Sequence, residues 1–149
     1  MSKTNQWESD LLNLLFLNTD VTLVGDAAGL QNSAAAGSLY VSLHTGDPGE
    51  AGTQLTSESA YGSYARVAVA RSGVGWTVSG SAPTQVVNAA AITFPACTSL
   101  TSLVTHFGVG TDATGAGKLL YKGTLTPSIT ITAGITPQIP ALGLTVTED

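Results

Sequence analysis

Charged residues are scarce in this sequence, and basic ones are the scarcest. Only 10% of the 149 residues are charged, and five basic side chains stand against ten acidic ones, which gives a formal net charge of −5. Binding to a phosphate backbone or an anionic membrane requires clustered Lys and Arg, which this composition lacks. We therefore expect neither nucleic acid nor a membrane as a partner. A surface so poor in charge suits repeated contact with other subunits.

Cysteine is almost absent, and the apolar runs are short. The lone Cys97 excludes an internal disulfide, and one cysteine with two distant histidines, His44 and His106, argues against a structural zinc site. The apolar run at residues 11–17 contains Asn13 and is too short for a secretory signal or a membrane span. We expect no metal and no cofactor.

The first segment has the pattern of a helix. Asn5 followed by Glu8 has the spacing of a capping box. An apolar stripe recurs at the helical period, formed by Trp7, Leu11, Leu14 and Leu15. Two interpretations remain open: the stripe packs against the protein's own sheet, or it lies in a groove on another subunit.

From residue 39 onward the hydrophobic period changes to two, which is typical of half-buried strands. Segments containing Gly and Pro separate these runs, as expected for turns. The pattern predicts an all-β fold, an antiparallel β-sandwich or jelly roll of about eight strands with one N-terminal α-helix. Residues 1–37 form the helix and a linking arm, and residues 38–149 form the body. The expected strands are residues 39–44, 64–71, 75–79, 90–94, 103–109, 119–125, 128–132 and 142–147.

His44 and Asp47 stand three residues apart where the first predicted strand ends, an arrangement that raises the question of an active site. Catalysis would need an orienting group and a nucleophile or metal, and the nearest candidates, Thr45 and Glu50, belong to the same turn. Gly, Asp and Pro within residues 45–49 are typical turn residues. We interpret this segment as a turn rather than a catalytic site.

Other chemical motifs fail on spacing. The glycine-rich residues 108–118 resemble a phosphate-binding loop, but Asp112 occupies the position that requires glycine, and Leu119 stands where Ser or Thr would hold magnesium. No acidic residue occurs from Ser59 to Thr111, so the middle strands supply no carboxylate pair for glycoside cleavage. No catalytic residue is predicted.

Arg66 and Arg71 are the only charged residues in the same interval, with Tyr61, Tyr64 and Trp76 nearby in sequence. They are candidates for an aromatic and cationic contact surface. The alternative is a strand whose arginines extend to the solvent at its ends.

Several phrases carry a resemblance to a known family. They are "SLYVSLHTGDPGEAGTQLTSESAYGSYARVAVARS", "GWTVSG", "NAAAITFPAC", "THFGVGTDATGAGKLLYKGTL" and "GITPQIP". Together with the N-terminal "WESDLLNLLF", they resemble a family of small virion proteins of tailed bacteriophages, whose members are described as capsid decoration (cement), head-fibre or tail-fibre-like proteins.

The resemblance implies a non-enzymatic structural protein made in the bacterial host cytoplasm and placed on the capsid exterior. Its main partner would be the major capsid protein, and self-association as a trimer would match the capsid's local three-fold axes. The expected partner contacts are Trp7, Leu11, Leu14, Leu15, Asp47, Tyr61, Arg66 and Arg71. One alternative is a tail or neck fibre protein that recognises host-surface glycan. Another is a small carbohydrate-binding module or enzyme that uses Trp7 and Trp76 as sugar platforms.

Overall fold

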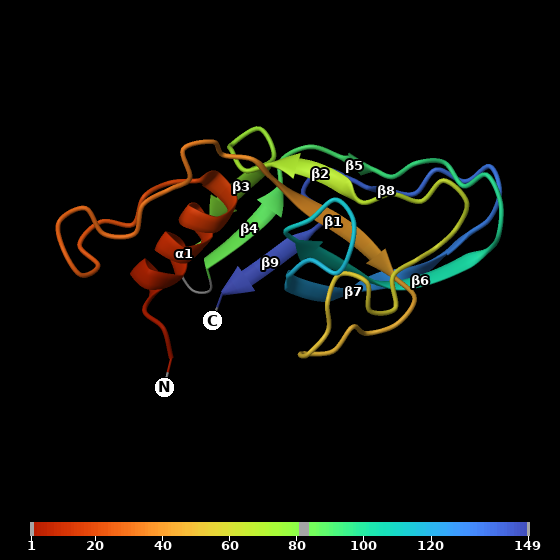
Figure 1. The fold of residues 1–149 in the computed structure, drawn as a ribbon, viewed down its shortest axis with the longest axis horizontal. Helices are drawn as coiled ribbons and strands as arrows, with labels where there is room; N and C mark the ends of the chain where they lie inside the picture. Colours follow the sequence, from red (N-terminus) through yellow and green to blue (C-terminus); the bar gives the residue numbers. More distant parts are fainter. Residues whose placement is uncertain (1, 81–83, 149) are drawn as a thin grey trace. The chain divides into compact units, whose positions relative to one another are not determined.

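The computed structural model describes residues 2–80 and 84–148, and this part of the chain contains one helix and nine strands (Figure 1). The strands form antiparallel sheets of four, three and two strands. The predicted class, all-β with antiparallel sheets and one N-terminal helix, is confirmed. The helix has 13 residues, and no helix in the described ranges is long and apolar enough to cross a membrane.

The chain forms two compact units. The first comprises residues 1–38, 70–91 and 140–149, and the second comprises residues 39–69 and 92–139. Later segments return to the unit that holds the helix, so that unit has a sheet of its own.

The first unit is built on α1 (Asn5–Leu17), which packs against β3, β4 and β9. The predicted N-cap, Asn5, is wrong by one position, because Thr4 has the extended backbone of a cap and its side chain accepts a hydrogen bond from the Trp7 N–H. The buried row on α1 consists of Glu8, Leu12 and Phe16. The predicted stripe that begins at Trp7 is only half-buried. Both rows follow a helical spacing and are largely apolar, so periodicity did not distinguish them.

The sheet of the first unit has the order β3 (Trp76–Ser79), β4 (Thr84–Asn88) and β9 (Thr145–Glu148). Trp76 is fully buried and meets Phe16 edge to face, with ring centroids 4.8 Å apart. The central strand β4 was not predicted, because its inward positions include the polar residues Thr84 and Asn88. The side chain of Asn88 can be buried because its amide nitrogen donates hydrogen bonds to the carbonyl oxygens of Ala90 and Pro140.

The main sheet of the second unit has the order β2 (Val67–Ala70), β1 (Ser38–His44), β6 (Ser102–Gly110) and β7 (Leu119–Ile131). Two short strands, β5 (Ile92–Thr93) and β8 (Gln138–Ile139), pair separately.

Strand β7 joins two strands that the sequence predicted as separate. Pro127 was interpreted as a break between them. The pairing with β6 instead shifts register, from Val104 opposite Ile129 to His106 opposite Thr124. The irregularity accommodates Pro127, whose missing N–H is tolerated at such a bulge on an outer strand.

Arg71 completes the first unit at the end of α1. Its guanidinium donates to the carbonyl oxygens of Leu14 and Leu15, both at 2.7 Å, and to that of Ala36 at 3.1 Å. Carbonyl groups in the last turn of a helix have no partner within the helix, so a cation here supplies one. Arg71 therefore ties the helix end to the residues before β1.

Candidate interaction surface

His44 is a buried structural residue at the end of β1. Its Nδ1 lies 2.8 Å from the Thr56 carbonyl oxygen and its Nε2 lies 2.8 Å from Ser42 Oγ. A carbonyl oxygen can only accept, so Nδ1 carries the proton and, in the neutral ring, Nε2 accepts from the Ser42 hydroxyl. Desolvation by burial lowers the pKa of His44. The ring therefore fastens loop 45–58 to the sheet.

Loop 45–58 leaves β1 and returns to it. The Thr45 N–H donates to the Ser57 carbonyl, and the Ser59 N–H donates to the Leu43 carbonyl. The Asp47 carboxylate accepts from the Gly49 N–H at 2.9 Å, as predicted for turn chemistry. His106 lies opposite His44 in the β1–β6 ladder. Within residues 2–80 and 84–148, no group of three or more His, Cys, Asp or Glu side chains is arranged to hold a metal ion.

The loop is locked by a buried ion pair. Arg66 Nε and a terminal nitrogen donate to the two carboxylate oxygens of Glu58 at 2.7 and 2.8 Å, and the Arg66 side chain is only 2% exposed. The Tyr64 hydroxyl also donates to Glu58, at 3.0 Å. Hydrogen bonding to Glu58 raises the pKa of Arg66, which strengthens the positive charge that the Glu58 carboxylate meets here.

The same Arg66 reaches across to the hairpin loop between β6 and β7. It donates to the carbonyl oxygens of Asp112 at 2.8 Å and Gly115 at 2.7 Å. The fully buried Gln54 reinforces this link, because its amide accepts from the Asp112 N–H at 2.9 Å. Loop 45–58 and hairpin loop 111–118 are thus held together as one body.

The glycines of the suspected phosphate loop have a packing role. A Cβ atom at Gly110 or Gly117 would collide with the Gln54 side chain, and Gly117 also has φ of +52°. Only glycine leaves room for Gln54 at these positions. The glycine-rich segment is a hairpin loop, as expected from its spacing.

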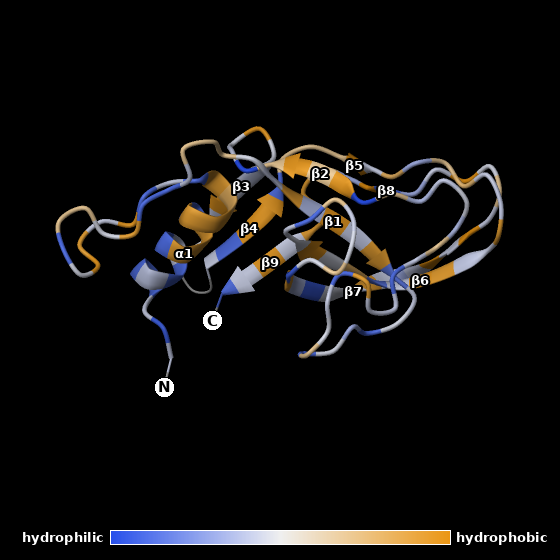
Figure 2. Cartoon of the chain, viewed as in Figure 1, coloured by the Kyte–Doolittle hydropathy of each residue, from blue (hydrophilic) through white to orange (hydrophobic). Residues whose placement is uncertain are grey.

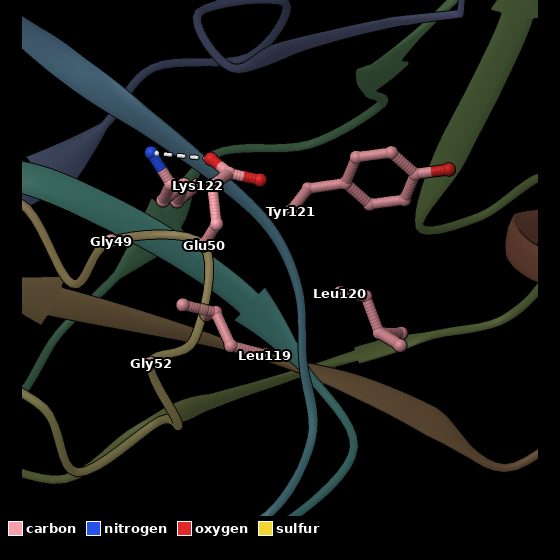
Figure 3. A pocket seen from close by; sticks show the side chains of 7 residues that line it. All are labelled: Gly49, Glu50, Gly52, Leu119, Leu120, Tyr121 and Lys122. Atoms are coloured by element: carbon pink, nitrogen blue, oxygen red, sulfur yellow. Dashed lines mark ion pairs between the residues drawn. The ribbon is translucent and has the colours of Figure 1, made fainter.

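Two shallow cavities flank the locked loops. One, of about 290 Å³, lies where Lys122 bridges Asp47 and Glu50, each at 3.1 Å (Figure 3). Figure 3 shows Lys122 and Glu50 pointing toward each other at one side of this cavity. The other, of about 260 Å³, is lined by Leu55, Glu58, Tyr64, Ala65, Arg66, Ala113, Thr114 and Gly115.

The structure divides the eight expected partner contacts into two groups. Asp47 is exposed, and Trp7, Leu11, Leu14 and Leu15 are half-buried along α1. Tyr61, Arg66 and Arg71 are engaged inside their own units. Tyr61 is 2% exposed and donates to the Pro95 carbonyl, and burial raises the pKa of its hydroxyl to about 12. The cationic and aromatic surface proposed from sequence is therefore largely internal.

The most exposed apolar side chains were not singled out from the sequence. All of them except Leu103, which lies in β6, are outside the named strands, and three of them have positive φ. For the members outside the predicted strands, the signal available in the sequence was an apolar residue next to Gly, Ser or Thr. The group comprises Leu23, Val24, Leu30, Leu55, Val74, Leu100, Leu103, Ile135 and Leu142.

The fold and this surface define a small β-rich protein with rigid loops and apolar residues exposed between them. Over residues 2–147 the chain matches the family described as "Podophage GP4 fiber I protein gp80". The chain belongs to this family, which confirms the resemblance to small virion proteins of tailed bacteriophages and identifies it as a structural virion protein. A comparison with curated proteins gives no match.

Arg66→Ala is expected to destabilise the protein by roughly 3–5 kcal/mol, because it leaves the buried Glu58 without its cation and frees both loops. Urea unfolding followed by circular dichroism measures the change. Lys122→Ala is the control, since it removes only the two ion pairs with the exposed Asp47 and Glu50 and should change the free energy of unfolding little. A loss for Arg66→Ala no larger than that of the control would contradict the role assigned to the buried pair.

The stability of the protein should fall as the pH drops below 6.5, the ordinary pKa of histidine, because burial holds the pKa of His44 lower in the folded state. Below pH 6.5 the unfolded chain binds a proton at His44 more readily than the folded chain does. The stability that neutral His44 contributes is therefore fully present above pH 6.5, and it is lost as the pH falls from 6.5 through the lowered pKa of the folded state. Urea midpoints measured from about pH 7 to about pH 5 test this. His44→Gln should flatten the decline, and an unchanged slope would refute the assignment.

Proposed function

We propose that this chain is a fibre component on the outside of a tailed-phage particle, and that it acts by binding other proteins rather than by catalysis. The family match over residues 2–147 carries the proposal, since the family description names a fibre protein. The polar side chains of the locked loops are consistent with it. Glu58, Arg66 and Gln54 direct their hydrogen bonds into the fold and hold loops in place.

The first unit has the features of an attachment site. Loop 21–30 is closed by two backbone hydrogen bonds between Val21 and Leu30, at 3.0 and 2.8 Å, and by the Asp26 carboxylate. It presents Leu23, 81% exposed, together with Val24 (orange loop at the left of Figure 1). A preformed apolar loop loses little conformational entropy on binding. The half-buried stripe of α1, from Trp7 to Leu15, belongs to the same unit.

A fibre protein and a capsid decoration protein place different demands on such a surface. A decoration protein covers the head in many copies bound to the major capsid protein, and it opposes internal pressure by adding buried area. A fibre protein attaches at a few defined positions. The family description favours the fibre, and the location of the chain on the particle decides between the two.

Gold-labelled antibodies raised against the purified chain are expected to bind intact phage at the fibres or tail, in few copies per particle. Negative-stain electron microscopy locates the label, and antibodies against the major capsid protein mark the head as a reference. Label distributed evenly over the head would contradict the fibre proposal and support decoration.

Leu23→Asp in the phage gene should reduce incorporation of the chain into particles by at least about tenfold, because a charge on loop 21–30 would be buried on attachment. Quantitative immunoblotting of purified particles measures incorporation. Val74→Asp is the matched control, since Val74 is 79% exposed in the same unit but lies outside the loop. Equal incorporation of the two variants would show that loop 21–30 is not part of the attachment site.

A further inference from the structure

Charge is segregated within the second unit. Residues 92–110 and 123–139 contain no Asp, Glu, Lys or Arg at all. The charged residues of this unit lie in or next to loop 45–58 and hairpin loop 111–118, and they are Asp47, Glu50, Glu58, Arg66, Asp112, Lys118 and Lys122. Along β6 and β7, the charged residues therefore lie toward hairpin loop 111–118, and the opposite end of these two strands carries none.

The uncharged end is one continuous surface. Strand β6 begins there and β7 ends there, since Ser102 pairs with Ile131 and Leu103 with Thr130. The adjoining loops lie side by side, because the Cys97 N–H donates to the Ile135 carbonyl and the Gly134 N–H donates to the Cys97 carbonyl, both at 2.8 Å. We call residues 94–104 and 128–137 the neutral end (right of Figure 1).

Large apolar side chains are exposed on the neutral end. Leu100 is 70% exposed, Leu103 is 51% exposed and Ile135 is 44% exposed. Small hydroxyl side chains such as Thr101 and Thr130 surround them, and Figure 2 shows the end mostly in pale colours and orange. Apolar patches without charge mark protein contacts, because interface centres are depleted of charged residues.

The backbone of the neutral end also favours chain-to-chain contact. Strand β7 is an outer strand of its sheet, and outer strands present unpaired N–H and C=O groups. Lys122 and Pro127 protect its first part, since charge and proline discourage strand addition. The last part, residues 128–131, has neither.

We propose that the neutral end is the surface through which copies of this chain associate. Copies that each carry a net charge of −5 repel one another, so a self-contact is favoured where no charge faces its own copy. The nine residues of β6 separate Ser102 at this end from hairpin loop 111–118 by roughly 25–30 Å, several Debye lengths at physiological salt. Loop 45–58 returns closer, since Ser59 hydrogen-bonds Ser102, but the Glu58 that precedes Ser59 is paired with the buried Arg66. Closed cyclic symmetry is the usual outcome for such a homo-oligomer.

This proposal is independent of where the chain sits on the particle, because association of the purified chain tests it alone. Sedimentation velocity from about 1 μM to about 100 μM should show a closed oligomer for the natural sequence. Raising NaCl from about 0.05 M to about 0.5 M should leave association unchanged or stronger, since salt screens the repulsion between acidic copies.

Leu100→Asp should weaken association by at least about tenfold, because it brings charge into an apolar contact. Leu142→Asp is the matched control: Leu142 lies in the first unit, is 64% exposed and has φ of 61°, against 70% and 64° for Leu100. Asp tolerates this backbone conformation. Circular dichroism checks folding, and Ile135→Asp serves as a second variant if Leu100→Asp does not fold.

Dissociation by Leu100→Asp or Ile135→Asp, with Leu142→Asp unaffected, supports the proposal. A natural chain that stays monomeric over the whole range would overturn it and assign the neutral end to a different protein. The proposal would also be overturned if Leu100→Asp and Leu142→Asp weakened association equally, or if high salt abolished association.

Discussion

The buried ion pair between Glu58 and Arg66 is the contact on which the second unit depends. Removing two charges from water is unfavourable unless nearly every donor and acceptor is satisfied. Arg66 meets this condition by bonding both Glu58 oxygens and two carbonyl groups of hairpin loop 111–118. One side chain therefore orders two loops that are distant in sequence, and Gln54 fills the space between them.

This arrangement also gathers charge at one end of the second unit. Loop 45–58, which the ion pair orders, carries the exposed Asp47, and Asp47 pairs with Lys122 on the neighbouring part of β7. The opposite end is left with hydroxyl and apolar side chains around Leu100 and Leu103. A division of this kind fits the proposed association through the neutral end, because like charges on two copies would then lie away from the contact.

The two units suit different tasks in a virion protein. The first combines an amphipathic helix, secured at its end by Arg71, with the rigid apolar loop around Leu23. The second combines locked loops with the neutral end. Both use polar side chains mainly to fix the backbone, which suits the binding role proposed above, because rigid surfaces lose less entropy when they bind.

The sequence by itself determined the all-β class, the N-terminal helix and the turn at Asp47, because alternation, glycine and proline act locally along the chain. The resemblance to the family rested on particular phrases of the sequence, and the family match bore it out. Only the tertiary structure decided which row of α1 is buried, that β4 exists, and that Pro127 sits in a bulge rather than a break. It also turned Arg66 and Tyr61 inward and left Leu100 exposed. These outcomes depend on partners far away in sequence, such as Asp112 for Arg66 and Pro95 for Tyr61, and local periodicity carries no information about such pairings.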